Sequence, residues 1–256
     1  MSSQPLLKIC GLRDPGQAAA VAALGADAIG VIAVASSPRF VPPQQRPEVF
    51  AAVQAAAADC LGVLVVADPR DDAQAELDPA RGHRVIQLHG AESPATCRRL
   101  RQQLGCTVWK ALRQRSPDDL QRAEAYAGAV DALVLDAWMP DQLGGTGQAI
   151  PLEWLQDWQS PLPWWLAGGV RADRVAELLS RVEPTGLDAS SGVERAPGDK
   201  DLEQVRRLLA ALPGRTVPPA AEGRGAGEPR CWPAAQDDCL PRRGPEQPVR
   251  PSALCR

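Results

Sequence analysis

This 256-residue chain has little of what marks several common protein classes. Its formal net charge is only -3, so it lacks the broad basic field that attracts nucleic acid, and an anionic ligand would have to be bound locally. No apolar run approaches the roughly 20 residues that cross a bilayer, and the N-terminus has no basic segment followed by an apolar one. We therefore expect a cytoplasmic protein that binds neither nucleic acid nor membrane.

The seven cysteines also lack a pattern. None stands in a CxxC pair or at the spacing of a metal site, so we expect reduced thiols and no bound metal. What the chain does have is a hydrophobic fraction of 45% and a charged fraction of 23%, values typical of a globular protein whose length allows a sizeable core.

Apolar runs alternate with helix-like stretches as far as residue 212. The first helix, for example, is predicted to follow Asp14, which can cap it, with Pro15 in the first turn and Gln17 three residues after the cap. Strands are predicted at short apolar runs, several of which are continuous enough to indicate burial on both faces. The predicted strands cover residues 7–11, 28–34, 61–66, 84–89, 107–112, 132–136, 164–167 and 186–190. The predicted helices cover residues 15–24, 47–58, 94–104, 117–127, 152–158, 173–181 and 201–212, with a weaker helix within 71–80.

This alternation predicts an α/β protein built as a single (β/α)8 TIM barrel. An open doubly wound sheet is the alternative that the same alternation permits. No GxGxxG follows the first strand, and polar residues gather at the C-terminal ends of several strands, where a barrel has its active site. Both observations favour the barrel.

The composition changes at Pro213. From there to the C-terminus the chain is rich in proline, glycine and arginine and has no helical or alternating period. Such a segment cannot bury enough apolar surface to offset its ordering entropy. We predict a catalytic barrel domain over residues 1–212 and a disordered tail over residues 213–256.

The first predicted strand carries a thiol and an amine on one face. Side chains alternate along a strand, so Lys8 and Cys10 share a face while Leu7 and Ile9 take the other. A nearby positive charge favours the thiolate of a cysteine. We therefore interpret Cys10 as a candidate general base whose pKa is lowered by Lys8.

Further motifs follow at regular intervals along the chain. The full set is Lys8-Ile9-Cys10-Gly11, Ser37-Pro38-Arg39-Phe40-Val41, Gln87-Leu88-His89-Gly90, Leu135-Asp136 with Gly144-Gly145-Thr146-Gly147, Leu166-Ala167-Gly168-Gly169-Val170, and Asp188-Ala189-Ser190-Ser191-Gly192-Val193-Glu194 with Gly198-Asp199-Lys200-Asp201. In this order and spacing the chain, from about residue 6 to 212, resembles the phosphoribosylanthranilate isomerase family of tryptophan biosynthesis.

The resemblance implies a (β/α)8 barrel that catalyses a cofactor-free Amadori rearrangement of a small phosphorylated aminosugar. It also implies that Cys10 is the general base and Asp136 the general acid, while Asp188 orients the substrate. One acid and one base suffice for this chemistry. To deliver a proton near neutrality, a carboxyl group must be buried or lie near another anion, and the apolar strand before Asp136 makes burial plausible.

The remaining candidates would bind the substrate. Glycines after the seventh and eighth strands let the backbone approach a phosphate, a site common in barrels. Arg39 could pair bidentately with the anthranilate carboxylate. Lys8, Gln87 and His89 are further substrate-pocket candidates. The predicted phosphate-binding residues are Gly145, Gly168, Gly169, Ser190, Ser191 and Gly192.

Some features leave other hypotheses open. Residues 30–36 lack the phenylalanines usual in the family, which affects the expected shape of the anthranilate pocket. The alternative functions are an isomerase of the related histidine-pathway aminoaldose, which would use two aspartates, and a non-catalytic phosphate-binding or scaffolding barrel. Cys10 at a first-strand position speaks against the former, and the complete set of motifs against the latter. The oligomeric state, monomer or homodimer, is left open.

Overall fold

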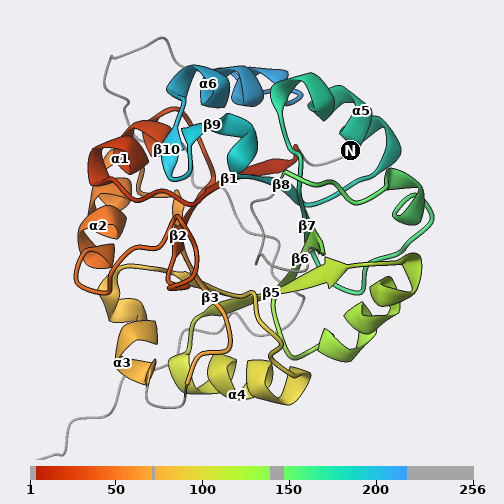
Figure 1. Ribbon diagram of the computed structural model, residues 1–256, viewed down its shortest axis with the longest axis horizontal. Coiled ribbons are helices and arrows are strands. Elements are labelled where there is room, and N and C mark those ends of the chain that lie inside the picture. The colour runs from red at the N-terminus through yellow and green to blue at the C-terminus, as the bar shows by residue number, and fades with distance from the viewer. Residues whose placement is uncertain (1–3, 71–72, 139–146, 218–256) are drawn as a thin grey trace, which may run out of the picture.

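The computed structural model describes residues 4–70, 73–138 and 147–217, which form a closed barrel of eight parallel strands ringed by helices (Figure 1). Each strand pairs with the next one in the chain, and the last pairs with the first, so the predicted barrel is confirmed and the open sheet is not found. The strands are β1 (Leu6–Cys10), β2 (Ala28–Ile32), β3 (Leu61–Val66), β4 (Val85–Leu88), β5 (Thr107–Gln114), β6 (Ala132–Ala137), β7 (Trp164–Ala167) and β8 (Gly186–Ala189).

The helices begin at caps that the sequence supplies. Asp14 accepts a hydrogen bond from the Gln17 amide, as predicted, and Ser93 and Asp201 cap two further helices in the same way. The α-helices are α1 (Pro15–Ala23), α2 (Arg46–Ala56), α3 (Gln74–Leu77), α4 (Pro94–Leu104), α5 (Val175–Arg181) and α6 (Leu202–Ala211). The 3-10 helices are η2 (Pro79–Arg81), η3 (Pro117–Tyr126), η4 (Leu152–Trp154), η5 (Ala172–Arg174) and η6 (Ser191–Val193).

Two predicted helices take a different form. The stretch 117–127 is the 3-10 helix η3, whose buried residues Leu120, Ala123 and Tyr126 recur every third position, the spacing that places side chains on one face of a 3-10 helix. The stretch 152–158 forms only the single turn η4. It is short, and Pro151 on one side and Ser160-Pro161 on the other leave it no room to extend.

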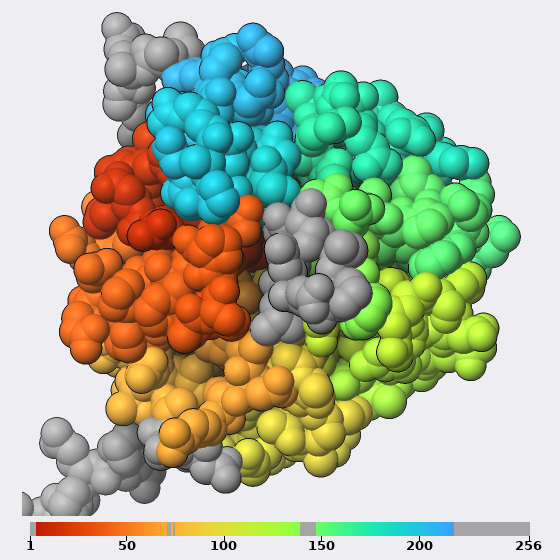
Figure 2. Space-filling model, viewed as in Figure 1, coloured from red at the N-terminus to blue at the C-terminus, as the bar shows by residue number. Residues whose placement is uncertain are grey.

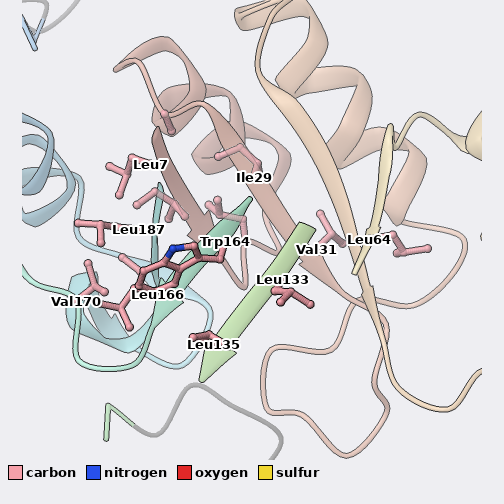
Figure 3. Packing of buried hydrophobic residues seen from close by; sticks show 14 of the residues in the cluster. Leu7, Ile29, Val31, Leu64, Leu133, Leu135, Trp164, Leu166, Val170 and Leu187 are labelled. Atoms are coloured by element: carbon pink, nitrogen blue, oxygen red, sulfur yellow. The ribbon is translucent and has the colours of Figure 1, made fainter. Parts of the chain in front are cut away.

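The strand residues divide into two buried layers. Those that point outward pack against the helices, and Figure 3 shows part of this layer, with Leu7, Leu187 and Leu166 from three neighbouring strands lying close together. Those that point inward fill the barrel, where the rings of Trp109 and Trp165 lie 4.9 Å apart between centroids. The predicted alternation in β1 is confirmed, because Leu7 and Ile9 belong to the outer layer while Cys10 belongs to the inner one.

The segment after β8 forms a hairpin on the rim of the barrel. It comprises β9 (Glu194–Ala196) and β10 (Asp199–Lys200), with Lys200 opposite Glu194. Figure 2 shows this segment, in cyan, against the orange segment that follows β2. No helix within the described part of the chain is both long and apolar enough to cross a membrane.

The first residues assigned to the tail are packed on the barrel. Arg215 donates to the carbonyls of Gly25 and Pro5 and forms an ion pair with Asp27, at the N-terminal ends of the strands. Residues 213–217 therefore belong with the barrel rather than with the predicted tail. The rest of that prediction, residues 218–256, lies outside the described residues.

Candidate active site

A pocket opens at the C-terminal ends of the strands and brings most of the predicted site residues together. Two predictions are not placed in it: Lys8 does not line it, and Gly145 lies outside the described residues. The pocket-lining residues predicted from the sequence are Cys10, Arg39, Gln87, His89, Asp136, Gly168, Gly169, Asp188, Ser190, Ser191 and Gly192. These residues are far apart in the sequence, from β1 near the N-terminus to the turn after β8. The closure of the barrel, which pairs β1 with β8, therefore assembles the pocket.

Cys10 ends β1 with its side chain facing the barrel interior and is 8% exposed. Its register partner on β2 is Gly30, and a Cβ atom there would stand 2.7 Å from the Cys10 sulfur. The Ser190 hydroxyl donates to the Cys10 carbonyl over 3.0 Å, which joins the end of β1 to the turn after β8. Sequence reasoning missed Gly30, although a glycine within an apolar strand is itself a sign of close approach.

Lys8 lies deeper in the barrel than Cys10 and is fully buried, with its Nζ atom 2.7 Å from an Asp188 carboxylate oxygen. Burial favours the neutral amine, but the charges and hydrogen bonds of Asp188 and Cys10 together outweigh it and raise the pKa of Lys8. Lys8 therefore stays charged, and it reaches the pocket through Asp188 and Cys10 rather than by lining it. This differs from its predicted place among substrate-contacting residues.

The pKa of Cys10 moves in the direction opposite to the predicted one. Burial raises it above the ordinary thiol value, and this outweighs the charges of Lys8 and Lys200, which lower it. The prediction identified the lysine correctly as a group that favours thiolate. It left out how strongly a closed barrel interior disfavours a charged sulfur.

Asp136 lies at the end of β6, 5% exposed, with one carboxylate oxygen accepting from the Ala137 amide over 2.9 Å. The other oxygen is 3.6 Å from Nε2 of His89, whose Nδ1 is 3.1 Å from the Gln87 amide nitrogen. Among the described residues, the Gln87 Oε1, His89 Nε2 and Asp188 Oδ1 atoms are buried without a hydrogen-bond partner. Buried polar atoms of this kind are costly unless a ligand pairs with them, so they mark the pocket as a binding site.

The predicted phosphate residues lie on two adjoining turns. Gly168 and Gly169 follow β7 with φ of 90° and 66°, a conformation that glycine adopts without strain. A side chain at Gly168 would collide with the Gln148 carbonyl, and one at Gly192 with the Val170 carbonyl. Ser190 precedes the single 3-10 turn η6, which contains Ser191 and Gly192. At these glycines no side chain covers the backbone, so an anion can approach it closely.

Arg39 lines the pocket from the segment after β2 and is 6% exposed. Its guanidinium donates to both carboxylate oxygens of Glu194, with Nη2 2.7 Å from Oε2 and Nε 2.9 Å from Oε1. The side chain crosses Gly11, where a Cβ would stand 2.5 Å from its Cδ atom. Glu194 stood in a quoted motif, but no sequence signal linked it to Arg39 across 155 positions.

The rest of the pocket is apolar. The β-branched residues Ile32, Val34 and Val65 form part of its wall, beside Ala167 and Val170. Such a wall, in the same pocket as a thiol and a carboxyl, can hold an aromatic ring while proton transfer takes place. Among the residues that the structure describes, no group of three or more histidine, cysteine, aspartate or glutamate side chains could hold a metal ion.

Comparisons with known proteins agree with this geometry. The family described as N-(5'phosphoribosyl)anthranilate (PRA) isomerase matches residues 7–211. A protein of Synechococcus elongatus named N-(5'-phosphoribosyl)anthranilate isomerase is 47% identical over 207 residues, or 80% of this chain and 95% of that protein. One of the same name from Synechocystis sp. is 46% identical, covering 80% of this chain and 94% of that protein. The solved phosphoribosyl anthranilate isomerase of Thermus thermophilus has a TM-score of 0.67 at 30% identity, covering 80% of this chain and 97% of that one.

Proposed function

Since the chain belongs to the N-(5'-phosphoribosyl)anthranilate isomerase family, we propose that Cys10 is its general base and Asp136 its general acid. The enzyme is an aldose-ketose isomerase of tryptophan biosynthesis that converts N-(5-phosphoribosyl)anthranilate to 1-(2-carboxyphenylamino)-1-deoxyribulose 5-phosphate. The observation that supports these roles is that a thiol and a carboxyl, from β1 and β6, line one pocket with an anion-binding wall.

The reaction requires one general acid that donates a proton to the substrate and one general base that removes a proton from it. Asp136 protonates the ring oxygen of the aminosugar, and the ring opens to a Schiff base whose C2 proton becomes acidic. The Cys10 thiolate removes that proton, and the resulting enolamine tautomerises to the product. Lys8 and Lys200 favour the thiolate against the burial that disfavours it.

The other pocket residues bind the parts of the substrate that do not react. The turns at Gly168-Gly169 and Ser190–Gly192 bind the phosphate through backbone amides, and Arg39 pairs with the anthranilate carboxylate. Gln87, His89 and Asp188 supply buried polar atoms for the sugar hydroxyls. Gly145 is retained as a proposed phosphate-binding residue.

The test follows turnover of freshly prepared N-(5-phosphoribosyl)anthranilate by its loss of fluorescence. We expect Cys10→Ser and Asp136→Asn each to lower kcat by roughly 10²- to 10⁴-fold, the usual contribution of a general acid or base. Cys106→Ser, a partly exposed cysteine outside the pocket, serves as the matched control and should turn over as the wild type does. Wild-type turnover no faster than that of either pocket variant would refute the assignment.

We also propose how the enzyme is organised. Cys10, Asp136 and the two anion-binding turns line one pocket of a single barrel, which supports a monomer as sufficient for activity, and a homodimer would then hold two independent sites. The proposed setting is the cytoplasm, with the phosphorylated substrate as the ligand and neither cofactor nor nucleic acid required. Residues 218–256 are proposed to be a tail that catalysis does not need.

A further inference from the structure

Glu194 is the centre of a buried ionic cluster beside the pocket. Its side chain is 4% exposed and accepts from Arg39, from Nζ of Lys200 over 2.6 Å and from the Gly198 amide over 3.0 Å. Lys200 itself is fully buried and also donates to the Ser190 carbonyl over 3.2 Å. One carboxylate thus joins the segment after β2 to the hairpin after β8.

The contacts within the cluster favour an ionised Glu194. Burial works against a charged Glu194, but the hydrogen bonds from Arg39 and the charge of Lys200 outweigh it and hold the pKa of Glu194 below its usual value. Glu194 also raises the pKa of Arg39, chiefly by hydrogen bonding. Burial lowers the pKa of Lys200 from its usual value, although the charge of Glu194 and its hydrogen bond act in the opposite direction.

The cluster also contacts two parts of the pocket that are proposed to bind different groups of the substrate. Arg39 stands on the wall proposed to contact the anthranilate carboxylate, and Ser190 begins the turn proposed to bind the phosphate. Neither lysine nor glutamate of the cluster lines the pocket itself. Glu194 and Lys200 can therefore affect substrate binding only through Arg39 and Ser190, which they contact.

We infer that Glu194 is a positioning residue that fixes the Arg39 guanidinium relative to the Ser190–Gly192 turn, and so determines recognition of the substrate carboxylate. The inference rests on the proposed role of Arg39. An arginine on a flexible stem loses side-chain entropy when it binds an anion, whereas one already held at two nitrogens has lost it beforehand. Removing Glu194 should thus weaken selection for the carboxylate rather than the proton transfers.

The test compares two substrates that differ only in that carboxylate: N-(5-phosphoribosyl)anthranilate and the corresponding aniline compound, prepared from aniline and ribose 5-phosphate. The measured quantity is the ratio of their kcat/KM values. We expect Glu194→Gln to lower the ratio about tenfold, mainly through KM of the anthranilate substrate, and Arg39→Ala to lower it roughly 10- to 100-fold. Asp199→Asn, which removes a carboxylate from the same hairpin but outside the pocket, should leave the ratio unchanged.

A second variant separates the loss of the Glu194 contact from the change in net charge. Glu194→Gln combined with Lys200→Met removes one charge of each sign and keeps the net charge of the cluster, and it should lower the ratio as the single variant does. Thermal melting checks that each variant is folded. If kcat/KM falls equally for both substrates, or the ratio survives in the double variant, the inference is overturned while the role of Arg39 stands. If Arg39→Ala itself leaves the ratio unchanged, the proposed role of Arg39 fails, and the inference fails with it.

Discussion

The two ends of the barrel interior contrast in chemistry. Near the N-terminal ends of the strands, Trp109 and Trp165 stack among alanine and valine side chains. Near the C-terminal ends, the inward positions hold Cys10, Asp136 and Asp188, all buried. Apolar burial stabilises a fold in proportion to area, whereas buried charges reduce stability unless they are paired. One end of the same barrel therefore stabilises the fold, and the other uses some of that stability to hold reactive groups.

The strongest test of this contrast removes an apolar side chain from the stabilising end. Trp165→Ala should lower the free energy of unfolding by about 3–5 kcal/mol, because the ring is fully buried and a cavity would remain. Urea unfolding measures the loss, and kcat of the folded fraction should change little. Trp138→Ala, at a site 38% exposed, is the control and should cost less than about 1 kcal/mol. Equal losses at both sites would contradict the contrast.

The next prediction concerns space at the reactive end. A methyl group at Gly30 would lie 2.7 Å from the Cys10 sulfur, so Gly30→Ala should displace the thiol and lower kcat about tenfold or more. Gly62→Ala is a matched control, because its methyl group would lie 2.7 Å from Phe50 in the outer layer. That variant should lose stability but keep kcat. The prediction fails if kcat falls equally in both variants.

A smaller effect is expected in the pH profile. The base acts when deprotonated, and burial raises the pKa of Cys10 above the ordinary thiol value of about 8.5, so kcat/KM should rise from pH 7 into the alkaline range. Lys8→Met removes a charge that favours thiolate and should shift the rise to higher pH. Asp188→Asn removes a charge that opposes it and should shift the rise to lower pH. Shifts in one common direction would contradict this account of the thiol.

The smallest effect is expected at the C-terminus. Truncation after Val217 should leave melting temperature and turnover unchanged. Truncation after Leu212 also removes Arg215 and its bonds to Asp27 and two carbonyls, and it should lower stability by about 1 kcal/mol. Turnover should persist in both, because these contacts lie at the end of the barrel opposite the pocket. A loss of turnover on removing only 218–256 would show that the tail takes part in function.

Local patterns were enough to predict the strands and most pocket residues. Apolar runs identified the eight strands of the barrel, and the alternation along β1 placed Lys8 and Cys10 on one face of it. The short polar hairpin strands β9 and β10 were not predicted. The helical stretches were less certain because a 3-10 helix such as η3 shares its composition with an α-helix and differs only in the spacing of buried residues.

The ionic contacts of the site could not be predicted in the same way. Lys8 pairs with Asp188 across 180 positions, and Arg39 with Glu194 across 155. No local pattern reports such contacts, since they exist only once the barrel has closed. The sign of the Cys10 pKa shift was wrong for a related reason, because it depends on how much solvent the closed barrel excludes.

The close pair of Trp109 and Trp165 also gives the barrel an optical signature. Their indole rings, 4.9 Å apart between centroids and inclined by 31°, are close enough for their excited states to couple. The near-ultraviolet circular dichroism of the protein should therefore carry a band that reports the closed strand cylinder itself. A state that kept its helices but opened the cylinder would retain the far-ultraviolet signal and lose this band.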